Sequence, residues 1–116
     1  MVTIERVESR RSQREFLEFP YRLYRDHPYW VPPLRSEQRA LFDVRRHPFY
    51  QEAEVERFLA VAGGRTVGRI AAILDHRYIR YQQEQAGWFG FLEMVEDAEV
   101  AAALIQAASD WLARRG

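Results

Sequence analysis

Glu93 is the residue whose type and position best suit acid–base chemistry in this chain. It closes the run 87–93, in which every other residue is apolar or glycine. Burial at the end of such a strand would disfavour the charged carboxylate and make Glu93 a usable general base. The alternative is that the carboxylate simply reaches solvent at the strand end. The sequence leaves both interpretations open.

Two other groups of ionisable residues could also do chemistry. Asp75 and His76 are adjacent, and a carboxylate beside an imidazole could poise a base. Neighbouring side chains in an extended segment point to opposite sides, however, which disfavours that pairing. Glu52, Glu54 and Glu56 alternate along the chain, so in a strand they would share one face and could receive a cationic amine. A solvated strand face is the other interpretation of the same pattern.

Composition excludes several classes of function. The chain has 17 basic and 17 acidic residues and a formal net charge of zero, so we expect no nucleic-acid partner. Every basic residue is arginine, which leaves no lysine for a Schiff base or a phosphate-binding loop. There is no cysteine, hence no disulfide, thiolate metal site or cysteine nucleophile. We expect no bound metal.

The length and the termini predict a single small domain. A chain of 116 residues is near the commonest domain size, so we assign residues 1–116 to one domain. Residues 2–7 are too short and too charged for a signal peptide. No run approaches the roughly 20 apolar residues of a membrane span. We therefore expect a cytoplasmic protein with no membrane partner.

A central hairpin is the clearest predicted element. Two apolar runs flank Gly63 and Gly64, and glycine readily supplies the positive φ that a two-residue hairpin turn needs. The hairpin covers residues 58–74. Both of its faces are apolar, so we expect the sheet to be covered on both sides.

The remaining elements complete an α+β plan. Residues 2–7 and 87–93 read as further strands, and Ser12 with Glu15 forms a capping box that predicts a helix start. Pro20 predicts a kink or a break in that helix. The final helix carries an apolar stripe formed by Val100, Leu104, Ile105, Ala108, Trp111 and Leu112. The predicted fold is α/β in the broad sense, of the α+β type: a mostly antiparallel sheet with flanking helices.

From about residue 55 to residue 116 the sequence resembles the GNAT superfamily of acyl-CoA N-acyltransferases, N-terminal half only. The resemblance makes residues 1–54 the N-terminal strand and helices, and residues 55–116 the hairpin, fourth strand and following helix of a partial GNAT-like fold. It implies acetyl-CoA or another acyl-CoA as cofactor. It also implies cofactor-binding residues at the strand end and the helix start: Leu92, Met94, Val95, Asp97, Ala98 and Glu99.

The chain departs from the family pattern at residues 95–99. The family loop carries glycines, whereas this stretch has none and contains three acids. A helix start usually attracts anions, but carboxylates already placed there would repel a pyrophosphate. In the family a fifth strand follows this helix, and residues 1–116 do not include one. We therefore expect weak acetyl-CoA binding and no turnover by the chain alone.

Three functions remain open at this point. The first is an N-acyltransferase domain or fragment whose other half is supplied elsewhere. The second is a non-catalytic half-fold that forms a homodimer, or binds a partner, through its open sheet edge at residues 87–93. The third is a small-ligand binder that uses the aromatic segment 29–34 as a lid.

Overall fold

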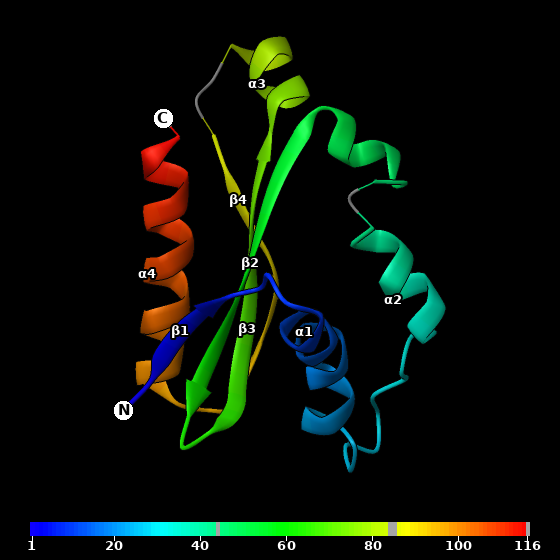
Figure 1. Ribbon diagram of the computed structural model, residues 1–116, viewed down its shortest axis with the longest axis vertical. Coiled ribbons are helices and arrows are strands. Elements are labelled where there is room, and N and C mark those ends of the chain that lie inside the picture. Colours follow the sequence, from blue (N-terminus) through cyan, green and yellow to red (C-terminus); the bar gives the residue numbers. More distant parts are fainter. Residues whose placement is uncertain (44, 84–85, 116) are drawn as a thin grey trace.

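The computed structural model describes residues 1–43, 45–83 and 86–115. The sheet separates helix α4 on one side from helices α1 and α2 on the other, and α3 stands at one end (Figure 1). The elements are β1 (Thr3–Arg6), α1 (Arg10–Leu23), α2 (Arg35–Leu41), the 3-10 helix η1 (Pro48–Gln51), β2 (Ala53–Ala62), β3 (Arg65–Asp75), α3 (His76–Gln82), β4 (Trp88–Met94) and α4 (Ala98–Arg114).

The described strands form one antiparallel sheet in the order β1-β2-β3-β4. This confirms the predicted α+β fold with a mostly antiparallel sheet and flanking helices. The β2–β3 hairpin turns at Gly63 and Gly64, whose φ angles are 58° and 74°. Both values lie in the left-handed region that glycine adopts at little cost, so the turn forms for the predicted reason.

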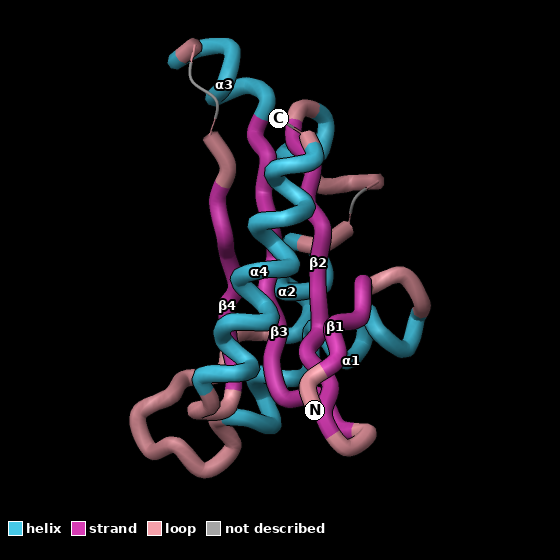
Figure 2. The backbone as a smooth tube through the Cα atoms, turned by 90° about the vertical axis from the view of Figure 1, so that its left-hand side faces the viewer, coloured by secondary structure: helices cyan, strands magenta, loops and turns pink. Residues whose placement is uncertain are grey.

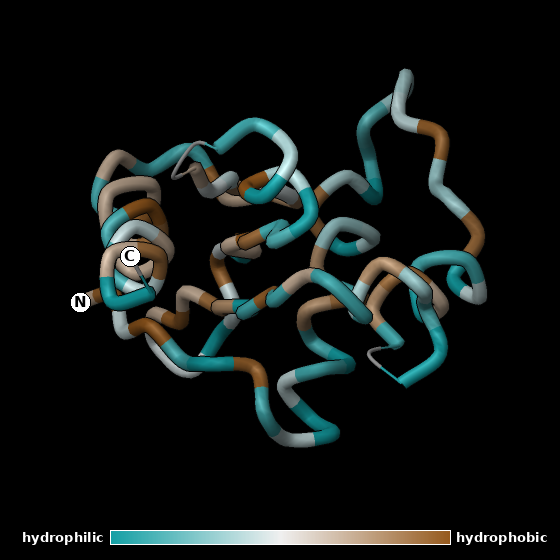
Figure 3. Tube along the Cα trace, turned by 90° about the horizontal axis from the view of Figure 1, so that it is seen from above, coloured by the Kyte–Doolittle hydropathy of each residue, from teal (hydrophilic) through white to brown (hydrophobic). Residues whose placement is uncertain are grey.

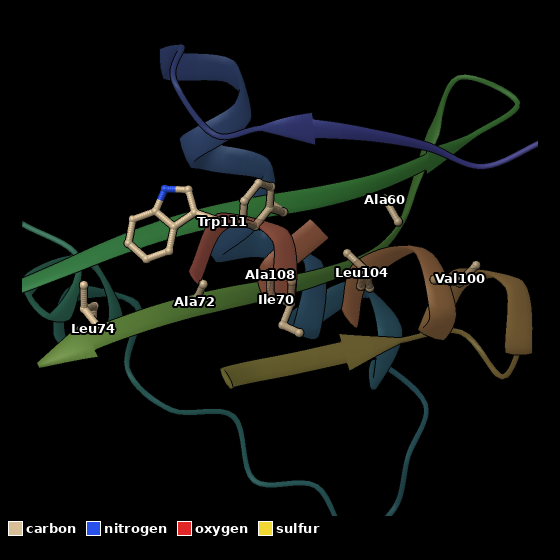
Figure 4. Close-up of a cluster of buried hydrophobic side chains, with 9 residues drawn as sticks. Ala60, Ile70, Ala72, Leu74, Val100, Leu104, Ala108 and Trp111 are labelled. Atoms are coloured by element: carbon tan, nitrogen blue, oxygen red, sulfur yellow. The ribbon is translucent and has the colours of Figure 1, made fainter. Parts of the chain in front are cut away.

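Helix α4 covers one face of the sheet. Figure 2 looks onto this face, with α4 in front of the strands. When the chain is coloured by hydropathy, α4 alternates hydrophobic and hydrophilic segments around its turns, as expected for a helix that packs on one side only (Figure 3). The close-up in Figure 4 shows α4 side chains over those of the hairpin, in a buried cluster of Phe58, Ala60, Ile70, Ala72, Leu74, Val100, Leu104, Ala108 and Trp111.

Helix α1 and Phe42, the residue that follows α2, cover the opposite face. The second buried cluster contains Val7, Phe16, Phe42, Leu59 and Ala71. Phe16 of α1 and Phe42, directly after α2, pack edge to face with their ring centroids 5.2 Å apart. The hairpin is therefore covered on both sides, as its doubly apolar pattern predicted.

The N-terminal helices differ from their predictions in detail. The α1 cap is Ser9, whose side chain accepts the Ser12 N–H at 3.0 Å while the Ser12 hydroxyl accepts the Ser9 N–H at 3.0 Å. The predicted capping box of Ser12 with Glu15 is wrong, because an equally good cap precedes it by one turn. Helix α1 is not broken at Pro20, since the Tyr24 N–H still reaches the Pro20 carbonyl at 3.0 Å.

Helix α3 was not predicted from the sequence. It begins directly after β3, where the Asp75 side chain accepts the backbone N–H groups of Arg77 and Tyr78. That carboxylate satisfies amide groups that a helix start otherwise leaves without partners. Asp75 thus serves as a helix cap.

Leu104 and Ile105 of α4 should differ sharply in their contribution to stability. Leu104 is 0% exposed against the sheet, whereas Ile105 is 40% exposed, although both belong to the predicted apolar stripe. We expect Leu104→Ala to lower the free energy of unfolding by about 2–5 kcal/mol, because it leaves a cavity in the core. Ile105→Ala, the matched control, should lower the free energy of unfolding by less than about 1 kcal/mol. Urea denaturation measures both, and equal losses would contradict this packing of α4.

Candidate active site

A bulge in β4 sets the position of Glu93. Arg69 of β3 pairs with Glu93, and Ala71 pairs with Gly90, so β4 has one residue more than β3 between these two pairs. Within this stretch Phe91 has a φ of 57°, in the left-handed region that non-glycine residues rarely adopt. A bulge bends the strand and re-aims its side chains. Glu93 comes to lie half-buried, directly across from Arg69.

Tyr24, the residue that ends α1, holds the Glu93 carboxylate. Its hydroxyl donates a hydrogen bond to Glu93 Oε2. This bond to a carboxylate, with burial as the second cause, raises the pKa of Tyr24 to about 12. The phenol is therefore protonated at neutral pH and remains a donor. The Trp30 ring lies 5.3 Å from the Tyr24 ring and supports it from the segment between α1 and α2.

Arg69 places a buried cation beside the same carboxylate. The residue is only 4% exposed, and its Nη1 donates to the Phe16 carbonyl at 2.7 Å. The guanidinium also lies over the rings of Phe16 and Phe91, at 4.7 and 5.9 Å from their centroids. Burial lowers the pKa of Arg69 to about 10, against the opposing effect of the Glu93 charge. Arg69 is therefore still a cation at neutral pH.

These three side chains can support proton transfer. A carboxylate is the only one of them able to accept a proton at neutral pH, because the phenol and the guanidinium are already protonated. Tyr24 fixes one carboxylate oxygen of Glu93, and the cationic Arg69 is the residue paired with Glu93 on the neighbouring strand. Glu93 is thus placed as a general base would be, and its catalytic role stays a prediction.

The predicted cofactor-binding residues follow one another along the end of β4 and the start of α4. Leu92 is exposed and Met94 and Val95 are half-buried. The Val95 N–H donates to the Val67 carbonyl at 3.0 Å, so that amide already has a partner. In the part of the chain that the structure describes, no strand pairs with the outer edge of β4. This edge leaves backbone groups for an extended ligand such as a pantetheine arm.

The start of α4 fits a pyrophosphate poorly. The Asp97 side chain accepts the Glu99 N–H at 2.8 Å, so a carboxylate already occupies one of the free amides there. Asp97, Ala98 and Glu99 are exposed, and Glu96 adds a further negative charge. Residues 95–99 therefore do not suit the pyrophosphate of an acyl-CoA.

The other sequence candidates form ion pairs away from Glu93. His76 Nε2 lies 2.9 Å from Glu54 Oε2, and Asp75 caps α3, so the two neighbours do not form a pair. The alternating acids all have basic partners: Glu52 with Arg77 and Arg80, Glu54 with His76 and Arg115, and Glu56 with Arg6. This arrangement supports the solvated face rather than an amine-binding one.

Sequence reasoning missed Tyr24 and Arg69. A charged residue inside the apolar run of residues 67–74 was a usable signal for Arg69, because a strand buried on both faces keeps a charge only where it has partners. Tyr24 had no such signal. It lies 69 residues from Glu93, and only the packing of α1 brings the two together.

The residues that the structure describes contain no group of three or more His, Cys, Asp or Glu side chains that could hold a metal ion. Within the same ranges, no helix is long and apolar enough to cross a membrane.

Two known proteins are similar in sequence to most of this chain. The chain is 38% identical over 104 residues to a bacterial ceramide synthase of Caulobacter vibrioides (strain NA1000 / CB15N), covering 89% of this chain and 27% of that protein. It is 33% identical over 103 residues to Protein YghO of Escherichia coli (strain K12), covering 89% of this chain and 26% of that protein. The chain is homologous to both and spans about a quarter of their length. No protein-family model and no solved structure matches it.

Removing the Glu93 charge should change the titration of Tyr24. The raised pKa means that folding favours the neutral phenol, so this stabilisation is present below pH 10 and is lost as the pH rises towards about 12. In Glu93→Gln we expect the Tyr24 pKa to fall, because the hydrogen bond to a carboxylate is the main cause of the shift. The measurement is the ultraviolet absorbance of phenolate against pH, with the curve of a Tyr24→Phe version subtracted in each background.

The control for this titration is Glu37→Gln, which removes an exposed carboxylate in the first turn of α2. It should leave the Tyr24 curve unchanged. A Tyr24 curve that is identical in the wild-type chain and in Glu93→Gln would contradict the contact.

Proposed function

We propose that this chain forms part of the active site of an acyl-CoA-dependent N-acyltransferase. The observation that carries the proposal is the half-buried Glu93 carboxylate, which accepts from Tyr24 and faces Arg69 across a bulged strand. Homology to a protein named bacterial ceramide synthase supports the same reaction class. A ceramide is an amide of a long-chain amino alcohol, so its synthesis joins an acyl group to an amine.

In the proposed reaction Glu93 removes a proton from the acceptor amine. The amine nitrogen attacks the carbonyl carbon of an acyl thioester, the C–N bond forms and the C–S bond breaks. The departing sulfur takes up the proton that Glu93 received, which leaves the carboxylate ready for another cycle. Tyr24 keeps the carboxylate oriented, and acetyl-CoA or a longer acyl-CoA supplies the thioester.

The proposed acceptor is an amine attached to an apolar chain. Four large apolar side chains of β4 are exposed and could contact such a chain: Phe91 and Leu92 directly before Glu93, and Trp88 and Phe89 farther along the strand. The name of the Caulobacter relative agrees with a lipid-like amine. Burying these side chains against an alkyl chain would add about 25 cal/mol for each Å² of apolar surface removed from water.

Glu93→Gln should abolish most of the activity of a chimera. We would replace the matching segment of the Caulobacter ceramide synthase with this chain and follow ceramide formation from acyl-CoA and a long-chain amine. Because a general base typically contributes a factor of about 10²–10⁴, we expect Glu93→Gln to slow the reaction by about a hundredfold or more. Glu37→Gln, with the same loss of charge on α2, should keep the parent rate.

The chain on its own gives the baseline for this experiment. We expect it to show no turnover and to bind acetyl-CoA weakly, because no strand among the described residues lies on the outer side of β4 and because the start of α4 is acidic. Micromolar binding in calorimetry would contradict the second expectation. An unchanged rate in the Glu93→Gln chimera would overturn the proposed role of Glu93.

Self-association is a second candidate function, favoured by the edge position of β4. Strand β1 pairs with β2 at the other side of the sheet and therefore does not cover β4. The exposed edge carries aromatic residues and no lysine or proline of the kind that usually discourages edge pairing. Antiparallel pairing of two such edges would give a closed two-fold dimer.

Phe89→Lys should split the proposed dimer. Phe89 is 46% exposed on β4, and a lysine there would discourage strand pairing through charge and solvation. Light scattering at micromolar concentration should show a dimer for the wild-type chain and a monomer for the variant. Phe49→Lys, an exposed aromatic in η1, is the matched control and should remain dimeric. A wild-type monomer would exclude self-association through this edge.

A further inference from the structure

A basic trough lies between helices α1 and α2, apart from the Glu93 site. It consists of two adjoining cavities of about 430 and 570 Å³ that share four lining residues: Arg10, Gln13, Leu17 and Arg39. One cavity extends towards Tyr21 and the other towards Phe42 and Arg57. Neither contains Glu93, Tyr24 or Arg69. The trough is therefore a separate site on the side of the sheet away from α4 (Figure 1).

The trough concentrates positive charge. Its lining includes six arginines and two acids, in a chain whose formal net charge is zero. The arginines come from α1, from α2 and the segment after it, and from β2: Arg10, Arg14, Arg35, Arg39, Arg45 and Arg57. Because positive charge gathers here without matching acids, the surface attracts anions.

The two acids of the trough do not form ion pairs with most of these arginines. Glu18 accepts both the Nε and the Nη2 of Arg35, at 2.8 and 3.2 Å. Asp43 lies 3.9 Å from Arg46, outside the trough. Within the described ranges, none of the other five trough arginines forms an ion pair: Arg10, Arg14, Arg39, Arg45 and Arg57.

Arg57 gives the trough a partly desolvated cation at its base. Its guanidinium lies over the rings of Phe16 and Phe42, at 5.6 and 5.3 Å from their centroids. The residue is half-buried in β2, and burial lowers its pKa. A charge that has lost part of its hydration gains more from a bound anion than an exposed one does.

We propose that the trough between α1 and α2 binds the phosphate group of a phosphate ester, either a soluble one or a lipid headgroup. Guanidinium groups bind phosphate through paired hydrogen bonds, and several of them can share its oxygens. Arginines reach the trough from two helices and the sheet, which suits an anion with three terminal oxygens better than a single carboxylate. Leu17, Tyr21 and Phe42 supply apolar surface for the rest of the ligand.

Two probes with the same headgroup chemistry test the proposal. Glycerol 3-phosphate, titrated calorimetrically into the 116-residue chain, represents a soluble ester. Phosphatidic acid in phosphatidylcholine vesicles, followed by co-sedimentation, represents a lipid. Glycerol and pure phosphatidylcholine vesicles are the phosphate-free controls. We expect at least one phosphate probe to bind while the controls do not.

Three variants test whether the phosphate probes bind in the trough. Arg39→Gln and Arg10→Gln each remove an exposed arginine that both cavities share, and Arg65→Gln removes an exposed arginine at the far hairpin end. Because each shared arginine would donate charge-assisted hydrogen bonds to the phosphate, each trough variant should weaken binding by about tenfold or more. Arg65→Gln should bind as the wild-type chain does, and circular dichroism checks that all three fold.

Each outcome bears on the proposal. Binding of glycerol 3-phosphate that is lost in Arg39→Gln or Arg10→Gln supports a soluble ester, and binding of the vesicles alone with the same loss supports a lipid headgroup. Failure of both probes to bind overturns the proposal. So does an equal loss in Arg65→Gln, which would mean unspecific attraction to arginine. None of these results depends on acyltransferase activity, so they leave the proposed role of Glu93 untouched.

Discussion

The β2–β3 hairpin is buried on both faces, and most of the remaining chain is arranged to cover it. Leu59 and Ala71 lie beneath α1, while Phe58, Ile70 and Ala72 lie beneath α4. A sheet with two apolar faces cannot be stable in water as a hairpin alone, because each face needs a packing partner. The positions of α1 and α4 therefore follow from the hairpin.

The candidate site lies where polar side chains stand among the apolar residues between the sheet and α1. Arg69 is a charged residue in the buried hairpin, and it persists there because the Phe16 carbonyl, two aromatic rings and the Glu93 charge all compensate its burial. The bulge in β4 brings Glu93 opposite this cation, and the end of α1 brings Tyr24. The same packing that buries the hairpin thus assembles a carboxylate with a fixed environment.

Helix α1 links the two proposed sites. Its inner face contributes Phe16 to the core, and the residue that ends it, Tyr24, reaches Glu93. Its outer stripe, with Arg10 and Leu17, lines the trough that faces α2. A movement of α1 would therefore alter both proposed sites.

The sequence by itself determined the elements with strong local patterns. Gly63 and Gly64 specified the hairpin turn, and the spacing of Val100, Leu104 and Trp111 specified a helix that packs on a sheet. The sequence also predicted that Glu93 lies near the end of an apolar strand. These features depend on periodicity and on local backbone preferences, both of which act between near neighbours in the chain.

Only the tertiary structure decided the surroundings of Glu93 and the place where α1 begins. Tyr24, Arg69 and Glu93 meet because α1 packs on the sheet and because β4 carries one extra residue at Phe91, which has no glycine to signal the positive φ. Ser9 prevailed over Ser12 as the helix cap because Ser12 is buried and bonds back to Ser9. Contacts of this kind join residues that are distant in sequence or equivalent in local propensity, so their outcome depends on the packing of the whole domain.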